Sequence, residues 1–109
     1  MKITAKTNNA TLTGSETSYV LDFGTIKKNS KAKTTVTVEG ENLQILTSNT
    51  SCGCTRAETN KIDSTKTEVD ITYKNTHNVS PFSKEVYLNV TETSSNNRVV
   101  IQVKGNVIN

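Results

Sequence analysis

The strongest constraint on the fold of this chain is the strict alternation of apolar and polar residues in short runs. A spacing of two places apolar side chains on one face of a β-strand, whereas a helix would need spacings of three and four. Polar or turn-forming residues separate each run from the next. The clearest runs are Tyr19-Leu21-Phe23, Val36-Val38, Val69-Ile71-Tyr73, Val86-Leu88-Val90 and Val99-Ile101-Val103.

The segments between these runs are rich in residues that favour turns. Further strands are expected over residues 3–12 and near Leu43 and Ile45, and the longest irregular segment, "KNTHNVSPFSK", contains the only proline. About seven short strands at this spacing predict an all-β antiparallel β-sandwich that forms one domain over residues 1–109. Turns are expected at "KKNSK", "EGEN", "KIDSTKTE" and "TETSSNN".

Composition supports strands and argues against two classes of partner. Val and Ile together outnumber Leu by 18 to 5, and Thr occurs 19 times. Branched side chains suit a pleated sheet better than a helix, so we expect almost no helix. The net charge of +3 is too small and too dispersed to indicate nucleic acid as a partner. No run approaches the roughly 18 apolar residues that span a membrane, and the opening segment lacks the apolar core of a secretory signal.

The densest basic run is a short stretch without aromatic residues that could stack on bases. We therefore expect a solvated hairpin turn, with a secondary role in steering the chain toward an acidic surface. Its members are Lys27, Lys28, Lys31 and Lys33.

The two cysteines, Cys52 and Cys54, are separated only by Gly53. Zinc usually takes four ligands, and the only other soft ligand is His77. A redox pair is typically C-x-x-C at a helix start, and no helix is expected. In a strand, residues two apart lie on the same face with Cα atoms about 6.6 Å apart, too far for a disulfide unless Gly53 provides a kink. We expect two reduced thiols packed inward, with Gly53 marking a bulge or a close backbone approach. The short disulfide remains open.

No catalytic set is evident either. His77 has no carboxylate partner at a fixed spacing, and no glycine-rich phosphate loop is present. The sequence therefore predicts a protein without enzymatic activity, cofactor or metal.

Three motifs carry a resemblance to a known family. They are "DFGTI" at residues 22–26, "SCGCT" at residues 51–55 and "KGNV" at residues 104–107. With the alternating strands between them, they resemble small SCGCT-containing domains of gut bacteria and their phages. These are similar to the abnormal-spindle, SPD-2 and Hydin type and the major-sperm-protein type of immunoglobulin-like sandwich. The resemblance covers about residues 19–107 and implies an immunoglobulin-like fold with no catalytic residues to transfer.

A single domain of this type, without a recognisable export signal, is similar to the immunoglobulin-like auxiliary proteins on capsids of tailed phages, including the crAss-like phages. The resemblance implies a structural protein of the virion that binds the major capsid protein in many copies. The alternative is a bacterial cell-envelope domain that binds a protein by pairing an exposed strand edge. Residues 2–13 and 75–84 show the weakest alternation of apolar and polar residues, so they are the expected contact segments.

Overall fold

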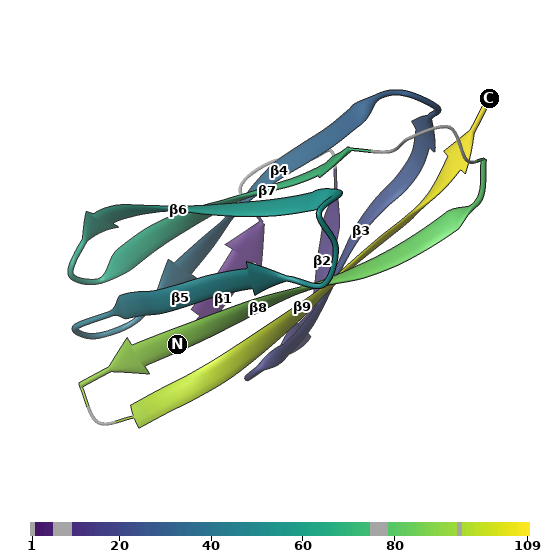
Figure 1. Cartoon of the computed structure of the whole chain (residues 1–109). Coiled ribbons are helices and arrows are strands. Elements are labelled where there is room, and N and C mark those ends of the chain that lie inside the picture. Colours follow the sequence, from purple (N-terminus) through teal and green to yellow (C-terminus); the bar gives the residue numbers. More distant parts are fainter. Residues whose placement is uncertain (1, 6–9, 75–78, 94) are drawn as a thin grey trace.

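The computed structural model describes residues 2–5, 10–74, 79–93 and 95–109, which form nine β-strands in two sheets that pack face to face (Figure 1). One sheet has the order β1-β4-β7-β6, and the other has the order β2-β3-β9-β8-β5. No helix long enough to cross a membrane occurs among these residues. The strands are β1 (Lys2–Ala5), β2 (Thr11–Ser15), β3 (Ser18–Lys27), β4 (Lys31–Glu39), β5 (Gln44–Thr50), β6 (Thr55–Asp63), β7 (Lys66–Lys74), β8 (Pro81–Glu92) and β9 (Ser95–Ile108).

The predicted all-β, immunoglobulin-like sandwich is confirmed. The four-stranded sheet β1-β4-β7-β6 has the order A-B-E-D of an immunoglobulin domain, and β9, β8 and β5 correspond to strands G, F and C. Two details differ from the prediction. The described residues form nine strands rather than about seven, and β3 pairs with β9 in parallel. A parallel pair is possible because the chain leaves β3 for the other sheet and returns to β9 only after five more strands.

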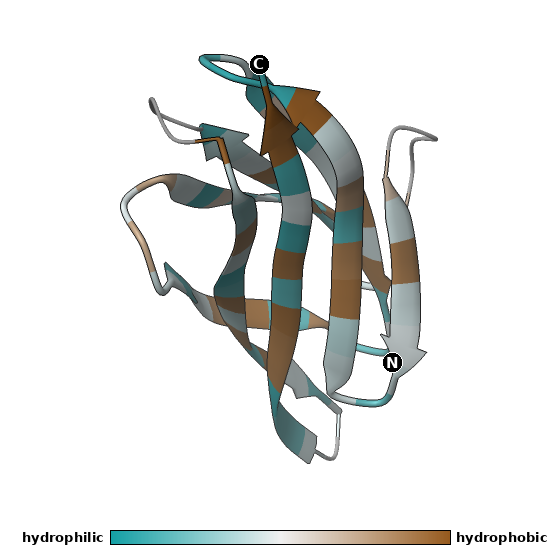
Figure 2. Cartoon of the chain, turned by 90° about the vertical axis from the view of Figure 1, so that its right-hand side faces the viewer, coloured by the Kyte–Doolittle hydropathy of each residue, from teal (hydrophilic) through white to brown (hydrophobic). Residues whose placement is uncertain are grey.

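The core lies between the sheets and consists of the alternating residues that define the runs. All the apolar residues named in the five runs are buried. Figure 2 shows hydrophobic and hydrophilic positions alternating along the strands. Among the described residues, no buried side-chain nitrogen or oxygen lacks a hydrogen-bond partner. The pattern of burial therefore follows directly from the two-residue period.

The predicted first strand over residues 3–12 is wrong, because this segment contributes to both sheets. β1 pairs with β4 and places Ile3 opposite Val38, whereas β2 pairs with β3 and places Leu12 opposite Leu21. A continuous strand would keep both residues in one sheet. The chain changes sheets between Ala5 and Thr11, with residues 6–9 outside the described part.

Strand β6 occupies much of what was predicted to be a turn over residues 61–68. Only Ser64 and Thr65 lie between β6 and β7. The Asp63 side chain accepts hydrogen bonds from the backbone N–H (2.7 Å) and the hydroxyl (2.6 Å) of Thr65, which holds the tight turn. Every residue of β6 from Glu58 to Asp63 is exposed, so this strand has no apolar alternation by which it could be recognised. The loop predicted over residues 91–97 is also shorter, since β8 reaches Glu92 and β9 begins at Ser95.

Candidate functional site

The two cysteines lie in the turn formed by residues 51–54, which connects β5 in one sheet to β6 in the other. Cys52 and Cys54 form a disulfide, and their Cα atoms are 5.2 Å apart. The expectation of two reduced thiols on one face of a strand is therefore wrong. Its premise fails because the turn shortens the Cα separation from about 6.6 Å in a strand to a value within the range of bonded cysteines.

Backbone and side-chain hydrogen bonds hold this turn in place. The Cys52 carbonyl accepts bonds from the Thr55 N–H (3.1 Å) and the Thr50 hydroxyl (3.0 Å). The Cys54 carbonyl accepts a bond from the Lys74 N–H (2.8 Å), and the Cys54 N–H lies 3.1 Å from the sulfur of Cys52. Both carbonyls are thus bonded to groups outside the disulfide ring, which supports the turn independently of the S–S bond.

Gly53 does not mark a bulge or a close approach, contrary to the prediction. A Cβ atom added there would meet nothing within 4 Å, and Gly53 is not among the residues with positive φ. Nothing in the described structure covers the turn on that side. The glycine itself is exposed, whereas both cysteines are half-buried and Cys54 packs against the core.

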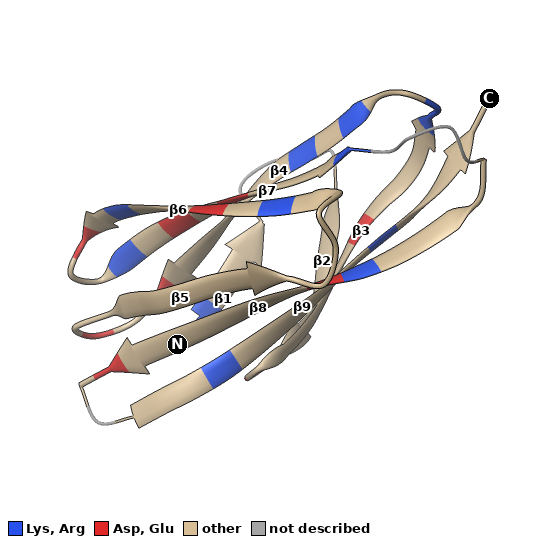
Figure 3. Cartoon of the chain, viewed as in Figure 1, with Lys and Arg blue, Asp and Glu red and all other residues tan. Residues whose placement is uncertain are grey.

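Beside this turn lies a depression of about 350 Å³ that is lined by cations from three strands. Lys31 of β4 lies directly opposite Lys74 of β7 in the sheet register, and Arg56 of β6 lies opposite Thr72 of β7. Figure 3 shows basic positions on β4, β6 and β7, some at this end of the sheet and others on β6 and β7 at the opposite end. The remaining lining comes from Gly53, Cys54, Thr55 and Thr72. No short sequence motif could reveal this cluster, because its cations are far apart in the chain.

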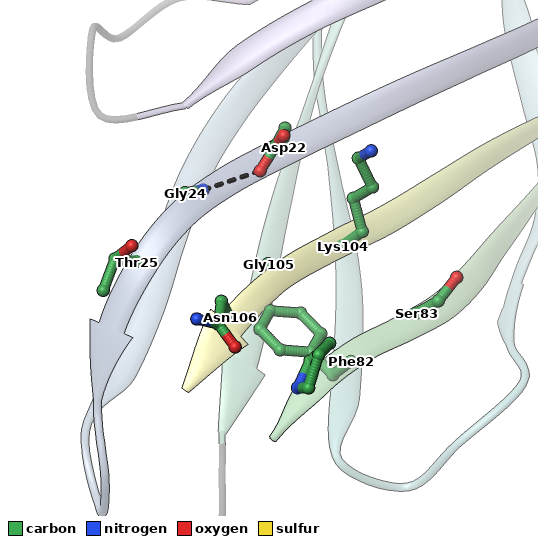
Figure 4. A pocket seen from close by; sticks show the side chains of 9 residues that line it. Asp22, Gly24, Thr25, Phe82, Ser83, Lys104, Gly105 and Asn106 are labelled. Atoms are coloured by element: carbon green, nitrogen blue, oxygen red, sulfur yellow. Dashed lines mark hydrogen bonds between the residues drawn. The ribbon is translucent and has the colours of Figure 1, made fainter. Parts of the chain in front are cut away.

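The "DFGTI" motif forms a bulge in β3 that shapes a second depression, of about 360 Å³ (Figure 4). Asp22 pairs with Lys104 and Thr25 pairs with Asn106, so two residues of β3 oppose Gly105 alone. The Asp22 carboxylate accepts the Gly24 N–H at 2.7 Å. Gly24 has φ +69°, which a residue with a side chain rarely adopts.

The glycine of the "KGNV" motif is required for a different reason. A Cβ atom on Gly105 would lie 2.8 Å from two carbon atoms of the Phe82 ring and 2.9 Å from the Gly24 carbonyl oxygen. The Phe82 ring is stacked on Tyr73 with centroids 3.7 Å apart, which restricts its movement on that face. Burial raises the pKa of the Tyr73 hydroxyl above 10.0. Since Phe82 is buried, the ring acts as a packing element between the sheets.

The predicted contact segments lie on different parts of the surface. Residues 2–13 contain β1 and the start of β2, which are the first strands of their respective sheets. Of residues 75–84, the structure describes only 79–84, where Val79 is exposed and Phe82 is buried. His77 lies outside the described residues. The four lysines of the basic turn are exposed, as predicted. The predicted hairpin is wrong, because the turn connects β3 in one sheet to β4 in the other.

Sequence reasoning missed an aromatic and cationic pair on the outer face of the five-stranded sheet. The Arg98 guanidinium lies 4.7 Å from the centre of the Tyr87 ring, which favours a cation–π contact. A hydrogen bond to Glu85 raises the pKa of the Tyr87 hydroxyl. Leu46 and Arg98 line a shallow depression of about 240 Å³ on the same face.

The family model described as "Protein of unknown function (DUF1573)" matches residues 12–107. No curated protein matches the chain. Among solved structures, an endo-fucoidan hydrolase from glycoside hydrolase family 107 is similar to this chain with 14% sequence identity and a TM-score of 0.49. The similarity covers 98% of this chain but only 15% of that enzyme, so the chain spans a small part of its length.

Proposed function

This chain belongs to the DUF1573 family, and we propose that it is a non-enzymatic structural protein that binds the major capsid protein of a tailed phage in many copies. In this proposal the protein acts as an auxiliary component of the virion. It needs no cofactor, because its function is to make contacts rather than to catalyse a reaction.

The observation that carries the proposal is the placement of the two N-terminal strands. β1 is an edge strand of one sheet and β2 is an edge strand of the other. Each has a strand partner on one side only, β4 for β1 and β3 for β2. An edge strand presents backbone N–H and C=O groups to a partner. The first contact segment predicted from the sequence therefore provides an edge of both sheets.

Short edges of this kind suit attachment in many copies. β1 has four residues and β2 has five, so strand addition at either edge would form only a few backbone hydrogen bonds. A single contact would be weak, and simultaneous contacts on a repeating surface would provide the affinity. The exposed lysines of residues 27–33 would add electrostatic attraction toward an acidic surface.

A second candidate is a cell-envelope domain that binds a protein partner through a strand edge. The observation that favours it is β6, which forms the opposite edge of the four-stranded sheet. β6 has nine residues, and those from Glu58 onward are exposed. A long edge of this kind can accept a partner strand in a single, tighter contact.

The experiment that tests the proposal compares lysine variants on the two sides of the sandwich. Thr4→Lys with Thr13→Lys places charge on β1 and β2, and Gln44→Lys with Asn60→Lys does the same on β5 and β6. Lysine on an edge strand disfavours strand pairing, while the added positive charge would not repel an acidic partner. These point changes spare Ile3 and Leu12, which pack against the core and would be lost if residues 1–13 were deleted.

Each variant is produced in infected cells in place of the wild-type chain, and its copy number in purified particles is measured. We expect the β1/β2 variant to fall to less than about one tenth of the wild-type occupancy, because avidity amplifies a weakened contact. The β5/β6 variant should retain full occupancy. Full occupancy of the β1/β2 variant would contradict docking at these edges. Loss confined to the β5/β6 variant would support attachment through β6 instead.

A further inference from the structure

The disulfide turn combines three features that the proposed function does not use. Cys52 and Cys54 are both half-buried, and Cys54 packs against the hydrophobic core. A Cβ atom at Gly53 would meet nothing within 4 Å, so the turn is open on that side. Cys54 also lines the cationic depression described above. A partly exposed disulfide beside cations is a setting in which thiolates are stabilised and thiol exchange is favoured.

Acidic partners neutralise the cations of the depression only weakly. Within residues 2–5, 10–74, 79–93 and 95–109, no ion pair involves Lys31 or Lys74. Arg56 pairs only with Glu58 at 3.1 Å, and both side chains are more than half exposed, so this surface ion pair contributes little. Lys31 and Lys74 are directly opposite one another in the register, an arrangement that destabilises a sheet. An anion formed in this depression would relieve that repulsion.

We propose that Cys52 and Cys54 form a thiol–disulfide exchange site, in which Lys31, Arg56 and Lys74 stabilise the thiolate released at Cys54. The co-reactant is a thiol, either a small molecule or a cysteine of another protein. Cys54 is the leaving sulfur because it lines the cationic depression. Its sulfur also lies 3.8 Å from the Thr55 hydroxyl, which can donate a hydrogen bond to a thiolate.

The exchange proceeds in two balanced steps. The thiolate of the first thiol attacks the Cys52 sulfur, a mixed disulfide forms, and the electron pair of the broken S–S bond remains on Cys54. A second thiolate then attacks the incoming sulfur of the mixed disulfide and releases Cys52 as a thiolate. The products are an external disulfide and the protein dithiol, and the two protons lost by the external thiols are available to the protein thiolates.

The geometry of the turn favours reversal of this exchange. The Cys52 and Cys54 carbonyls are bonded to Thr55, Thr50 and Lys74 rather than to groups inside the disulfide ring. These bonds do not depend on the S–S bond, so reduction should leave the turn folded. The two sulfur atoms would then stay close enough to close again without the chain refolding.

The first test measures exchange in the full, folded chain. The oxidised protein is incubated with mixtures of reduced and oxidised glutathione, and the reaction is quenched with acid. Free thiols are then alkylated, and the mass of the intact protein is measured by mass spectrometry. We expect a reversible transition between a form that gains no alkyl groups and a form that gains two, while the circular dichroism spectrum stays that of the folded chain. A disulfide that is reduced only when the chain unfolds would overturn the proposal, as would cysteines that oxidised glutathione cannot close.

The second test isolates the role of the cations. The site variant combines Lys31→Gln, Arg56→Gln and Lys74→Gln, and the matched control combines Lys2→Gln, Lys61→Gln and Lys66→Gln. Both variants lose three positive charges, but the control residues do not line the depression.

The rate at which iodoacetamide alkylates the reduced chain is measured as a function of pH. We expect the site variant to react about three to ten times more slowly than wild type at neutral pH, with the profile displaced to higher pH. The reason is that removing the three cations weakens the electrostatic stabilisation of the thiolate. The control should follow the wild-type profile. Equal rates for the site variant and the control would refute the stabilising role of the three cations.

Discussion

Replacing Gly105 by alanine tests the packing at the end of the sandwich where the "DFGTI" and "KGNV" motifs meet. The added Cβ would lie 2.8 Å from the Phe82 ring and 2.9 Å from the Gly24 carbonyl oxygen. Neither neighbour can move freely, because Phe82 is stacked on Tyr73 at 3.7 Å and Gly24 belongs to the bulged backbone of β3. Overpacking of this kind costs about 1 to 3 kcal/mol.

The expected loss of unfolding free energy can be converted into a change in melting temperature. An unfolding entropy of about 2.1 cal/mol/K per residue means that 1 kcal/mol lowers Tm by about 4 °C in a chain of this length. A loss of about 2 kcal/mol should therefore lower Tm by about 8 °C. Differential scanning calorimetry measures this directly, and the slope of urea unfolding shows whether the transition stays two-state.

The matched control is Gly53→Ala, which makes the same chemical change where a Cβ meets nothing within 4 Å. It should leave Tm unchanged or raise it slightly, because alanine restricts the unfolded chain more than glycine does. A second variant, Gly105→Ala with Phe82→Leu, should lose less stability than the sum of its single changes by more than about 0.5 kcal/mol. If Gly105→Ala and Gly53→Ala melted within about 2 °C of each other, the steric argument would be wrong.

Three further predictions concern the disulfide and the ionisable groups. Cys54→Ala should lower the free energy of unfolding by about 1.5 kcal/mol, the value that chain entropy gives for so short a ring. A chelator should leave the Tm of the wild-type chain unchanged, and a fall in Tm would indicate a bound metal. Burial raises the pKa of Tyr19 and Tyr73 above 10.0, so the stability that their neutral form contributes is present below pH 10 and is lost as the pH rises through the raised values. Unfolding measured between pH 8 and 12 should show less alkaline loss when both are replaced by phenylalanine, and an unchanged profile would contradict this assignment. The hydrogen bond from the Thr65 hydroxyl lowers the pKa of Asp63 below 3.8, so the stability that this hydrogen bond contributes is present above that pH and is lost as the pH falls through the lowered value. An NMR titration of Thr65→Ala should show a higher pKa for the Asp63 carboxyl, and an unchanged pKa would exclude this hydrogen bond as the cause.

The parts of the fold that could be predicted are those where one face of a strand is buried. Leu21, Val69, Leu88 and Ile101 are fully buried members of alternating runs, and the alternation arises because each strand has one face in the core. This same physical link is absent in β6, where both faces from Glu58 onward are exposed. Edge strands of this kind are held by backbone pairing, which leaves no pattern in the side chains.

The remaining differences have a common origin in pairing between distant segments. Alternation along one segment does not show which strands it pairs with. Ile3 pairs with Val38 in one sheet, whereas Leu12 pairs with Leu21 in the other. The parallel pairing of β3 and β9 likewise depends on the path of the chain between them. The alternation around residues 51–54 does not show that they form a turn, and this turn reduces the Cα separation of the two cysteines to 5.2 Å. The cationic depression has no local signal at all, since its cations come from three strands.

Quantitative mass spectrometry of purified phage particles tests most directly whether this chain is a structural component of the virion, as we propose. The chain and the major capsid protein are digested together and quantified against isotope-labelled standards, after the particles have been washed in high salt. Attachment through the β1 and β2 edges in many copies predicts a fixed, whole-number ratio to the major capsid protein that survives washing. Absence of the chain from washed particles, or a ratio that varies between preparations, would contradict a role in the virion.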